Sequence, residues 1–195
     1  CQEQVRQGET LVLSLIGYYS TGRLWLQKKE KYVEVLKPGS RMLGYVDCLE
    51  PASGEKMLMR WLKTMEMAAI QRQVQMKVLE GLRTAVKNCL EGCESVYYDI
   101  QQDGLVATLA DEHSRPVHLL SDGQRTILAM AADIAYRAAV LNPHLGDRAR
   151  LKTPGIVLID EIDLHLHPSW QRKIVKSLST SFPEIQFIVT THSPT

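Results

Sequence analysis

The second half of the chain shows the most regular spacing of hydrophobic positions. Residues 121–141 place apolar side chains three and four positions apart and predict a helix. Short apolar runs over residues 155–160 and 185–191 predict two strands, with a helix over residues 168–181 between them. The order helix, strand, helix, strand predicts parallel strands joined by crossover helices.

The first half of the chain is less regular. Residues 11–18 predict a buried strand. Residues 53–90 carry a stripe rich in methionine and leucine at helical spacing, which predicts one long helix or two, with Gly81 as a weak break. Packing between helices is the better explanation of that stripe, and a partner-binding face is the alternative.

Between these halves, two strand-like runs flank Asp103-Gly104, a pair common in hairpin turns, and predict a β-hairpin. Residues 115–120 predict a further short strand. We therefore expect three parts: core strands and loops (1–52), a helical lobe or arm (53–94) and the main core (95–195).

Composition adds few constraints. The 195 residues are 45% hydrophobic, which suits one globular domain or one domain carrying a smaller lobe. The net charge of +1 is too small to favour binding to nucleic acid or to a membrane through the charge of the whole chain.

No apolar run approaches the roughly 18 residues of a membrane span, and no signal peptide is visible, so we expect a cytoplasmic protein. The chain begins with Cys1 and stops directly after a strand-like run, so we expect a fragment of a longer protein.

The cysteines favour reduced thiols over a zinc site. Cys89 and Cys93 form a C-x-x-x-C pair in a helical context, and no second pair of metal ligands follows. Reduced cytosolic thiols are therefore a better explanation than a zinc site.

Polar residues gather where the two C-terminal strands end. Asp160 and Glu161 follow one strand, and Thr190, Thr191 and His192 follow the next. In a parallel sheet, ligands bind at the carboxyl ends of the strands. An apolar strand ending in Asp-Glu suits nucleotide hydrolysis, because one acid helps hold Mg²⁺ and the other orients or deprotonates water. The alternative is a strand that simply reaches solvent.

The start of the helix at residue 121 is a second candidate site. Ser121 is a good N-cap, and Gly123 leaves the backbone N–H groups unobstructed. Such a helix N-terminus can bind an anion, although an ordinary capped helix would have the same sequence.

In this order, "LSDGQ", "IVLIDE" and "TTHS" resemble the signature, Walker B strand and switch-histidine loop of ABC-type ATPases. The resemblance covers roughly residues 95–195. It implies an α/β fold with a mostly parallel sheet of the P-loop NTPase type, here an incomplete ABC ATPase head with an inserted helical lobe. "DEIDLHLHPSWQ" and "LSDGQRT" resemble the soluble branch, namely RecF-like and OLD-like ATPases and the antiphage ATPases of Septu and retron systems. "YYSTGRLW" and "YVDCLEPASGEK" are most similar to the Septu type.

The resemblance implies specific roles. Two heads would sandwich ATP, with Asp160 supporting Mg²⁺ through water, Glu161 as general base and His192 as the γ-phosphate switch. Arg125 would either assist the signature or cover the helix. The implied contacts to ATP held by the partner head come from Ser121, Asp122, Gly123 and Gln124.

One expected motif is missing. The chain contains no G-x-x-x-x-G-K-[ST] loop, whose backbone cradles phosphates and whose lysine neutralises them. We expect that loop to precede this segment in the natural chain, and we expect the segment alone not to bind ATP usefully. A degenerate ATPase is the alternative. The turn "YYSTGR" is a candidate for part of the nucleotide rim.

The histidines after the Walker B strand allow two interpretations. His165 and His167, with Asp163, have the spacing of metal ligands. In an extended segment they would flank Leu166 with both side chains on one side, and no third ligand is assigned. A structural or dimer-contact loop is therefore favoured.

The leading functional hypothesis is a dimerising ATPase that regulates a nuclease or DNA-acting partner in antiphage defence or DNA repair. The first alternative is the ATPase part of an OLD-type nuclease with a downstream Toprim domain. The second is a non-catalytic interaction module. A transporter subunit is disfavoured, because such subunits usually carry Gly at the position of Asp122 and Asp at the position of His167.

Overall fold

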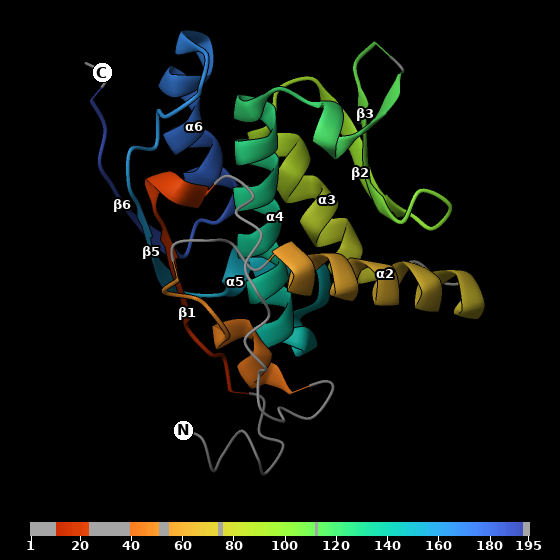
Figure 1. The fold of residues 1–195 in the computed structure, drawn as a ribbon. Coiled ribbons are helices and arrows are strands. Elements are labelled where there is room, and N and C mark those ends of the chain that lie inside the picture. The colour runs from red at the N-terminus through yellow and green to blue at the C-terminus, as the bar shows by residue number, and fades with distance from the viewer. Residues whose placement is uncertain (1–10, 24–39, 51–54, 74–75, 112, 193–195) are drawn as a thin grey trace.

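A parallel sheet lies at one side of the described part of the chain (Figure 1). The computed structural model describes residues 11–23, 40–50, 55–73, 76–111 and 113–192. Strands β1 (Leu15–Tyr19), β5 (Gly155–Ile159) and β6 (Ile185–Val189) form a three-stranded sheet in the order β1-β5-β6, and both pairings are parallel. The predicted α/β fold with parallel strands is confirmed.

Helices cover one face of this sheet (Figure 1). Helix α6 (Pro168–Ser181) connects β5 to β6, and the long helix α4 (Asp122–Leu141) packs behind β1. A short helix, α5 (Ala149–Lys152), leads into β5. The strand residues buried beneath these helices are Leu15, Gly17, Tyr19, Val157, Ile159 and Ile185.

The opposite face of the sheet is open within the described part of the chain. Ile16, Ile156, Leu158 and Ile188 point to it, and their exposed fractions run from 39% to 49%. The expectation that residues 11–18 form a buried strand is therefore only half right, because β1 alternates between buried and exposed positions. Parallel sheets usually have apolar residues on both faces because both are covered, which explains the unbroken apolar runs.

The stripe over residues 53–90 forms two helices, α2 (Glu55–Arg72) and α3 (Lys77–Cys89). The break expected at Gly81 is wrong, because α3 continues through that position, whereas α2 ends at Arg72, just before Gln73, whose φ is 50°. Gly81 is buried within α3, where an added Cβ would lie 3.1 Å from the carbonyl oxygen of Asp147. Its small size thus serves close packing. The predicted helix start at Ser53 lies outside the described residues.

Helix α2 packs on the body near its beginning and extends away from it at its far end (Figure 1). Leu58 and Leu62 are buried, and the ring of Trp61 meets that of Tyr136 edge-on with centroids 5.4 Å apart. Ile70, near the far end, is 64% exposed. In the described ranges, no helix combines the length and the apolar character that crossing a bilayer requires.

A second, antiparallel sheet contains β2 (Cys93–Asp99), β3 (Gly104–Leu109) and β4 (Ser114–Pro116). The predicted hairpin is confirmed, and Asp103 takes the left-handed backbone that the turn needs. The strand expected over residues 115–120 is shorter than predicted, because a 3-10 helix (Val117–Leu119) follows β4.

Two thiols lie beneath the junction of α3 and β2. Cys89 and Cys93 are buried and not disulfide-bonded. Burial raises the pKa of the Cys89 thiol to about 11, which keeps it protonated. 

The C-terminal end of α4 is anchored by one fully buried amide. Asn142 Oδ1 accepts the N–H of Leu13 at 2.8 Å, and its Nδ2 donates to the Leu13 carbonyl at 2.9 Å. The same Nδ2 lies 2.9 Å from the Thr153 hydroxyl, which precedes β5. Asn142 therefore supplies the hydrogen bonds that the backbone beside β1 would otherwise lack.

Replacing this amide should destabilise the fold. Asn142→Ala leaves the Leu13 N–H and carbonyl buried without partners, so we expect a loss of about 2–4 kcal/mol in the free energy of unfolding. Asn88→Ala, on the exposed side of α3, is the matched control and should change it by less than about 0.5 kcal/mol. Chemical denaturation of both variants measures the difference. Equal midpoints would contradict the anchoring role.

Candidate functional site

The strand-end group, consisting of Asp160, Glu161, Thr190 and His192, lies at one edge of the parallel sheet. Strands β5 and β6 are hydrogen-bonded neighbours, and Ile159 is paired with Val189 at their ends. The residues after the two strands therefore meet, as the sequence predicted. Thr190 donates its N–H to the Ile159 carbonyl at 3.0 Å, which continues the parallel pairing past the strand end.

The hydroxyl of Thr190 joins both acids. It donates to Asp160 Oδ1 at 2.6 Å and accepts the backbone N–H of Glu161 at 2.8 Å. One side chain from β6 thus fixes the carboxylate of the first acid and the backbone of the second. Because these bonds are short and directional, they limit the orientations that the acids can adopt.

Glu161 has an unusual backbone conformation. Its φ of 47° lies in the left-handed region, which a residue other than glycine seldom adopts. Its Oε1 lies 3.4 Å from Nε2 of His192. The His192 side chain is 85% exposed, whereas that of Glu161 is 33% exposed. The second acid therefore faces the switch-histidine candidate across an open surface.

Asp163 lies in the connecting loop, residues 160–167, beside the end of β6. Partial burial raises the pKa of this carboxyl, but hydrogen bonds from the Thr191 hydroxyl and from the backbone N–H groups of Asp163 and His192 outweigh it. The pKa of Asp163 is consequently below its ordinary value, and the carboxylate stays ionised. The backbone bond that joins this loop to the end of β6 is that of the Ile162 N–H, which donates to the Thr190 carbonyl at 2.9 Å.

The two histidines of this loop have different environments. The expectation of an extended segment is wrong, because His165 has a φ of 62° and turns the chain. Leu166 is buried, while His167 caps α6 by accepting the Ser169 N–H on Nδ1 at 3.3 Å. Among the described residues, no three His, Cys, Asp or Glu side chains are grouped so that they could hold a metal ion.

The candidate signature, residues 120–124, begins α4 with a capping box. Ser121 Oγ accepts the N–H of Gln124 at 3.4 Å, and Gln124 Oε1 accepts the N–H of Ser121 at 3.1 Å. The S-x-x-Q spacing is a sequence signal for this reciprocal cap. Asp122 is exposed and pairs with Arg125, so the arginine contacts the first turn of the helix.

Gly123 is where α4 meets the connecting loop. An added Cβ would lie 2.6 Å from the carbonyl oxygen of His165 and 3.4 Å from the Trp170 ring. The connecting loop, which begins with Asp160 and Glu161, therefore contacts the candidate signature at Gly123. This contact brings the candidate signature and the strand-end group, which belong to separate elements, together. The glycine is required here by a close approach of backbone to backbone.

A buried cluster that the sequence did not indicate lies behind this edge. The Tyr19 hydroxyl donates to Asp133 Oδ2 at 2.7 Å, and Nε of Arg137 donates to the same oxygen at 2.8 Å. Arg137 also binds the carbonyls of Gly44 and Val46. Burial and the neighbouring Asp133 raise the pKa of Tyr19 well above its ordinary value, so its hydroxyl remains a donor. The only sequence signal is an Asp and an Arg four positions apart on an apolar helix.

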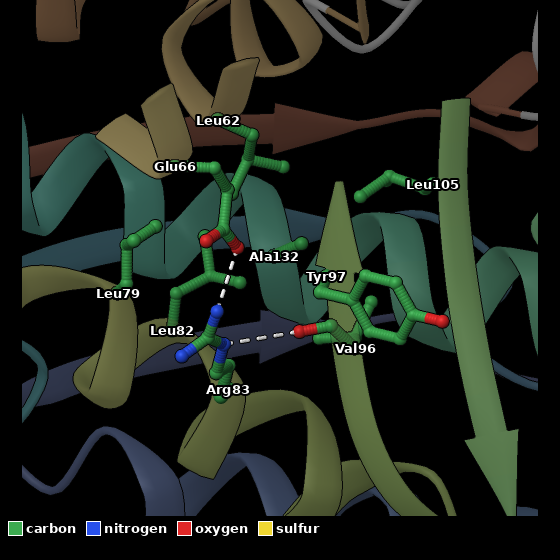
Figure 2. Close-up of a pocket in the computed structure, with 9 residues that line it drawn as sticks. All are labelled: Leu62, Glu66, Leu79, Leu82, Arg83, Val96, Tyr97, Leu105 and Ala132. Atoms are coloured by element: carbon green, nitrogen blue, oxygen red, sulfur yellow. Dashed lines mark hydrogen bonds and ion pairs between the residues drawn. The ribbon is translucent and has the colours of Figure 1, made fainter. Parts of the chain in front are cut away.

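A pocket elsewhere on the molecule does not belong to this site. It lies between α2, α3 and the β2–β3 hairpin, and its lining is mostly aliphatic (Figure 2). Nη2 of Arg83 pairs with Glu66 at 2.7 Å, and its Nε donates to the Val96 carbonyl at 3.2 Å. None of the pocket residues belongs to the strand-end group or to the signature.

Sequence comparison finds similarity to proteins that are named as probable ATPases. Residues 107–195 match the family described as "AAA domain, putative AbiEii toxin, Type IV TA system". The retron Vc95 probable ATPase of Vibrio cholerae serotype O1 biovar El Tor is 57% identical over 75 residues, and the retron Ec83 probable ATPase of Escherichia coli is 61% identical over 75 residues. The Septu protein PtuA of Bacillus mycoides (strain KBAB4) is 51% identical over 76 residues.

Each of these alignments covers 38% of the present chain, but only 14%, 14% and 10% of the respective relatives. The predicted resemblance to retron and Septu ATPases is confirmed. Among solved structures, the SMC head domain from Thermotoga maritima is similar with a TM-score of 0.44 and 19% identity, over 66% of this chain and 41% of that one.

The close approach at Gly123 can be tested by stability. Gly123→Ala should lower the melting temperature by about 5 °C, because the new methyl group must displace the His165 carbonyl or the helix. Gly104→Ala is the control, since the nearest atom to its Cβ lies at 3.6 Å. Differential scanning calorimetry measures both. An unchanged melting temperature for Gly123→Ala would show that the loop is not packed on the signature.

Proposed function

We propose that this segment is part of a dimerising, Mg²⁺-dependent ATPase in which the strand-end group acts on ATP bound by its own head and the signature acts on ATP bound by a partner head. The observation that supports this most strongly is the Thr190 hydroxyl, which holds the Asp160 carboxylate and the Glu161 backbone beside His192. The AAA domain match and the relatives named as probable ATPases support the same activity.

The donor atoms at this edge suit magnesium. Asp160, Glu161 and Thr190 offer carboxylate and hydroxyl oxygens, which are the ligands that Mg²⁺ prefers. Asp160 is the residue proposed to hold the ion, through water. Bound Mg²⁺ neutralises negative charge on the phosphate oxygens.

Glu161 is proposed as the general base. Its side chain is partly exposed, so a water molecule can approach it, and its backbone is fixed by Thr190. The carboxylate would take a proton from water as the water attacks the terminal phosphate. His192, whose Nε2 lies 3.4 Å from Glu161 Oε1, would contact that phosphate and report its loss.

The signature is proposed to act in trans. Ser121 and Asp122 are exposed at the N-terminal end of a helix of 20 residues, where backbone N–H groups favour an anion. We propose that Ser121, Asp122, Gly123 and Gln124 address the γ-phosphate held by the partner. The phosphate-cradling loop is proposed to lie in another part of the full-length protein. A nuclease or DNA-acting partner is proposed on the family resemblance alone.

Replacing the proposed base should separate ATP binding from hydrolysis. In the full-length protein, Glu161→Gln should bind ATP but turn it over at least about 100-fold more slowly, because the amide cannot accept the proton. Glu184→Gln, an exposed glutamate before β6, is the matched control. Phosphate release and equilibrium nucleotide binding give the two quantities. Wild-type turnover in Glu161→Gln would exclude this residue as the base.

Removing the Thr190 hydroxyl should weaken the site while keeping its shape. Thr190→Val should lower the ATPase rate of the full-length protein by about tenfold and raise the Mg²⁺ concentration needed for half-maximal activity. Thr190→Ser should restore both values. Thr108→Val, which removes a hydroxyl from the exposed hairpin, is the control. If Thr190→Val and Thr108→Val have the same ATPase rate and the same Mg²⁺ requirement, Thr190 does not organise the site.

A further inference from the structure

Tyr19 contacts both halves of the proposed site. Its backbone carbonyl accepts the N–H of Asp160 at 2.8 Å, and its side-chain hydroxyl donates to Asp133 Oδ2 on α4 at 2.7 Å. The first contact reaches the proposed magnesium residue. The second reaches the helix that carries the signature at its N-terminal end.

The second contact is made in a nearly water-free environment. The exposed fractions of Tyr19, Asp133 and Arg137 are 3%, 1% and 3%. Asp133 Oδ1 has no hydrogen-bond partner within the part of the chain that the structure describes. Burying a carboxylate with an unpaired oxygen opposes folding, and an apolar pair of similar size would pack here without that cost. General packing therefore does not account for the cluster.

The directions of β1 and α4 place the bond between Tyr19 and Asp133 far along the helix from the signature. Asn142, at the end of α4, binds Leu13 before β1, whereas Asp133 binds Tyr19 at the end of β1. The helix therefore runs antiparallel to the strand, and its N-terminal end points toward the strand ends (Figure 1). Ser121 lies about 18 Å along the helix from Asp133 at 1.5 Å per residue. A small rotation of α4 at Asp133 would thus displace Ser121 relative to the strand-end group.

We propose that Tyr19 is a positioning residue that sets the orientation of the signature helix relative to Asp160 through the Tyr19 hydroxyl and Asp133. This inference rests on the proposed ATPase function. Tyr19 contributes after ATP has bound, when the signature of one head must meet the nucleotide of the other. Its loss should therefore lower turnover more than ATP affinity.

The test compares two Tyr→Phe variants of the full-length protein. Tyr19→Phe keeps the buried ring and removes only the hydroxyl. Tyr45→Phe is the matched control, because its hydroxyl also donates to a backbone carbonyl beside β1, that of Ser14 at 2.6 Å. The readouts are KM for ATP and kcat per nucleotide-binding site, with sites counted by equilibrium binding on the same sample. Counting sites corrects for any fraction of molecules that is unfolded.

Tyr19→Phe should lower kcat per site by about tenfold or more and leave KM within about twofold of the wild type. Tyr45→Phe should match the wild type in both. Asp133→Asn keeps an acceptor for the hydroxyl but changes the charge beside Arg137. Its kcat per site should lie between those of Tyr19→Phe and Tyr45→Phe. Equal kcat values per site for Tyr19→Phe and Tyr45→Phe would overturn the inference, as would a loss confined to KM or to the number of binding sites.

These outcomes are distinct from a failure of the proposed function. If the wild type hydrolyses no ATP, or if Glu161→Gln keeps its turnover, the ATPase proposal itself is wrong. If the wild type is active, Glu161→Gln is inactive and Tyr19→Phe equals its control, only the positioning role is wrong.

Discussion

The parallel pairing of β5 with β6 is the constraint on which the rest of the site depends. It sets Ile159 opposite Val189, so that the chain leaving each strand turns at the same sheet edge. Thr190 then reaches across to Asp160 and to the backbone of Glu161. A shift of one residue in this register would move Thr190 to the other face of the sheet and separate it from both acids. The bonds of Thr190 to Asp160 and Glu161 would then be lost.

Helix α4 connects the sheet to the candidate signature at its N-terminal end. It is buried along most of its length and is tied to the segment of β1 at two levels, by Asn142 and by Asp133. Its first turn meets the connecting loop at Gly123, where there is no space for a side chain. The position of the candidate signature is thus limited by the bond of α4 to β1 and by the contact of Gly123 with the connecting loop. The two parts of the proposed site are therefore connected through buried contacts of the core.

Much of this arrangement could be predicted from the sequence because its signals are local. The cap at Ser121, the apolar periodicity of α4 and the turn at Asp103 each depend on residues a few positions apart. The turns at Gln73 and at His165 could not be predicted, because both use a left-handed backbone at residues other than glycine. Nor could the bond between Tyr19 and Asp133, whose partners are 114 positions apart in sequence.

Each ATP site is proposed to combine the strand-end group of one head with the signature of another. Mixing two full-length variants, Glu161→Gln and Ser121→Arg, tests it directly, since each homodimer has two defective sites. In a symmetric dimer, half of the randomly mixed molecules would carry one intact site, so the mixture should regain roughly a quarter of the wild-type ATPase rate. A mixture no more active than its separate components would contradict a site shared between two heads.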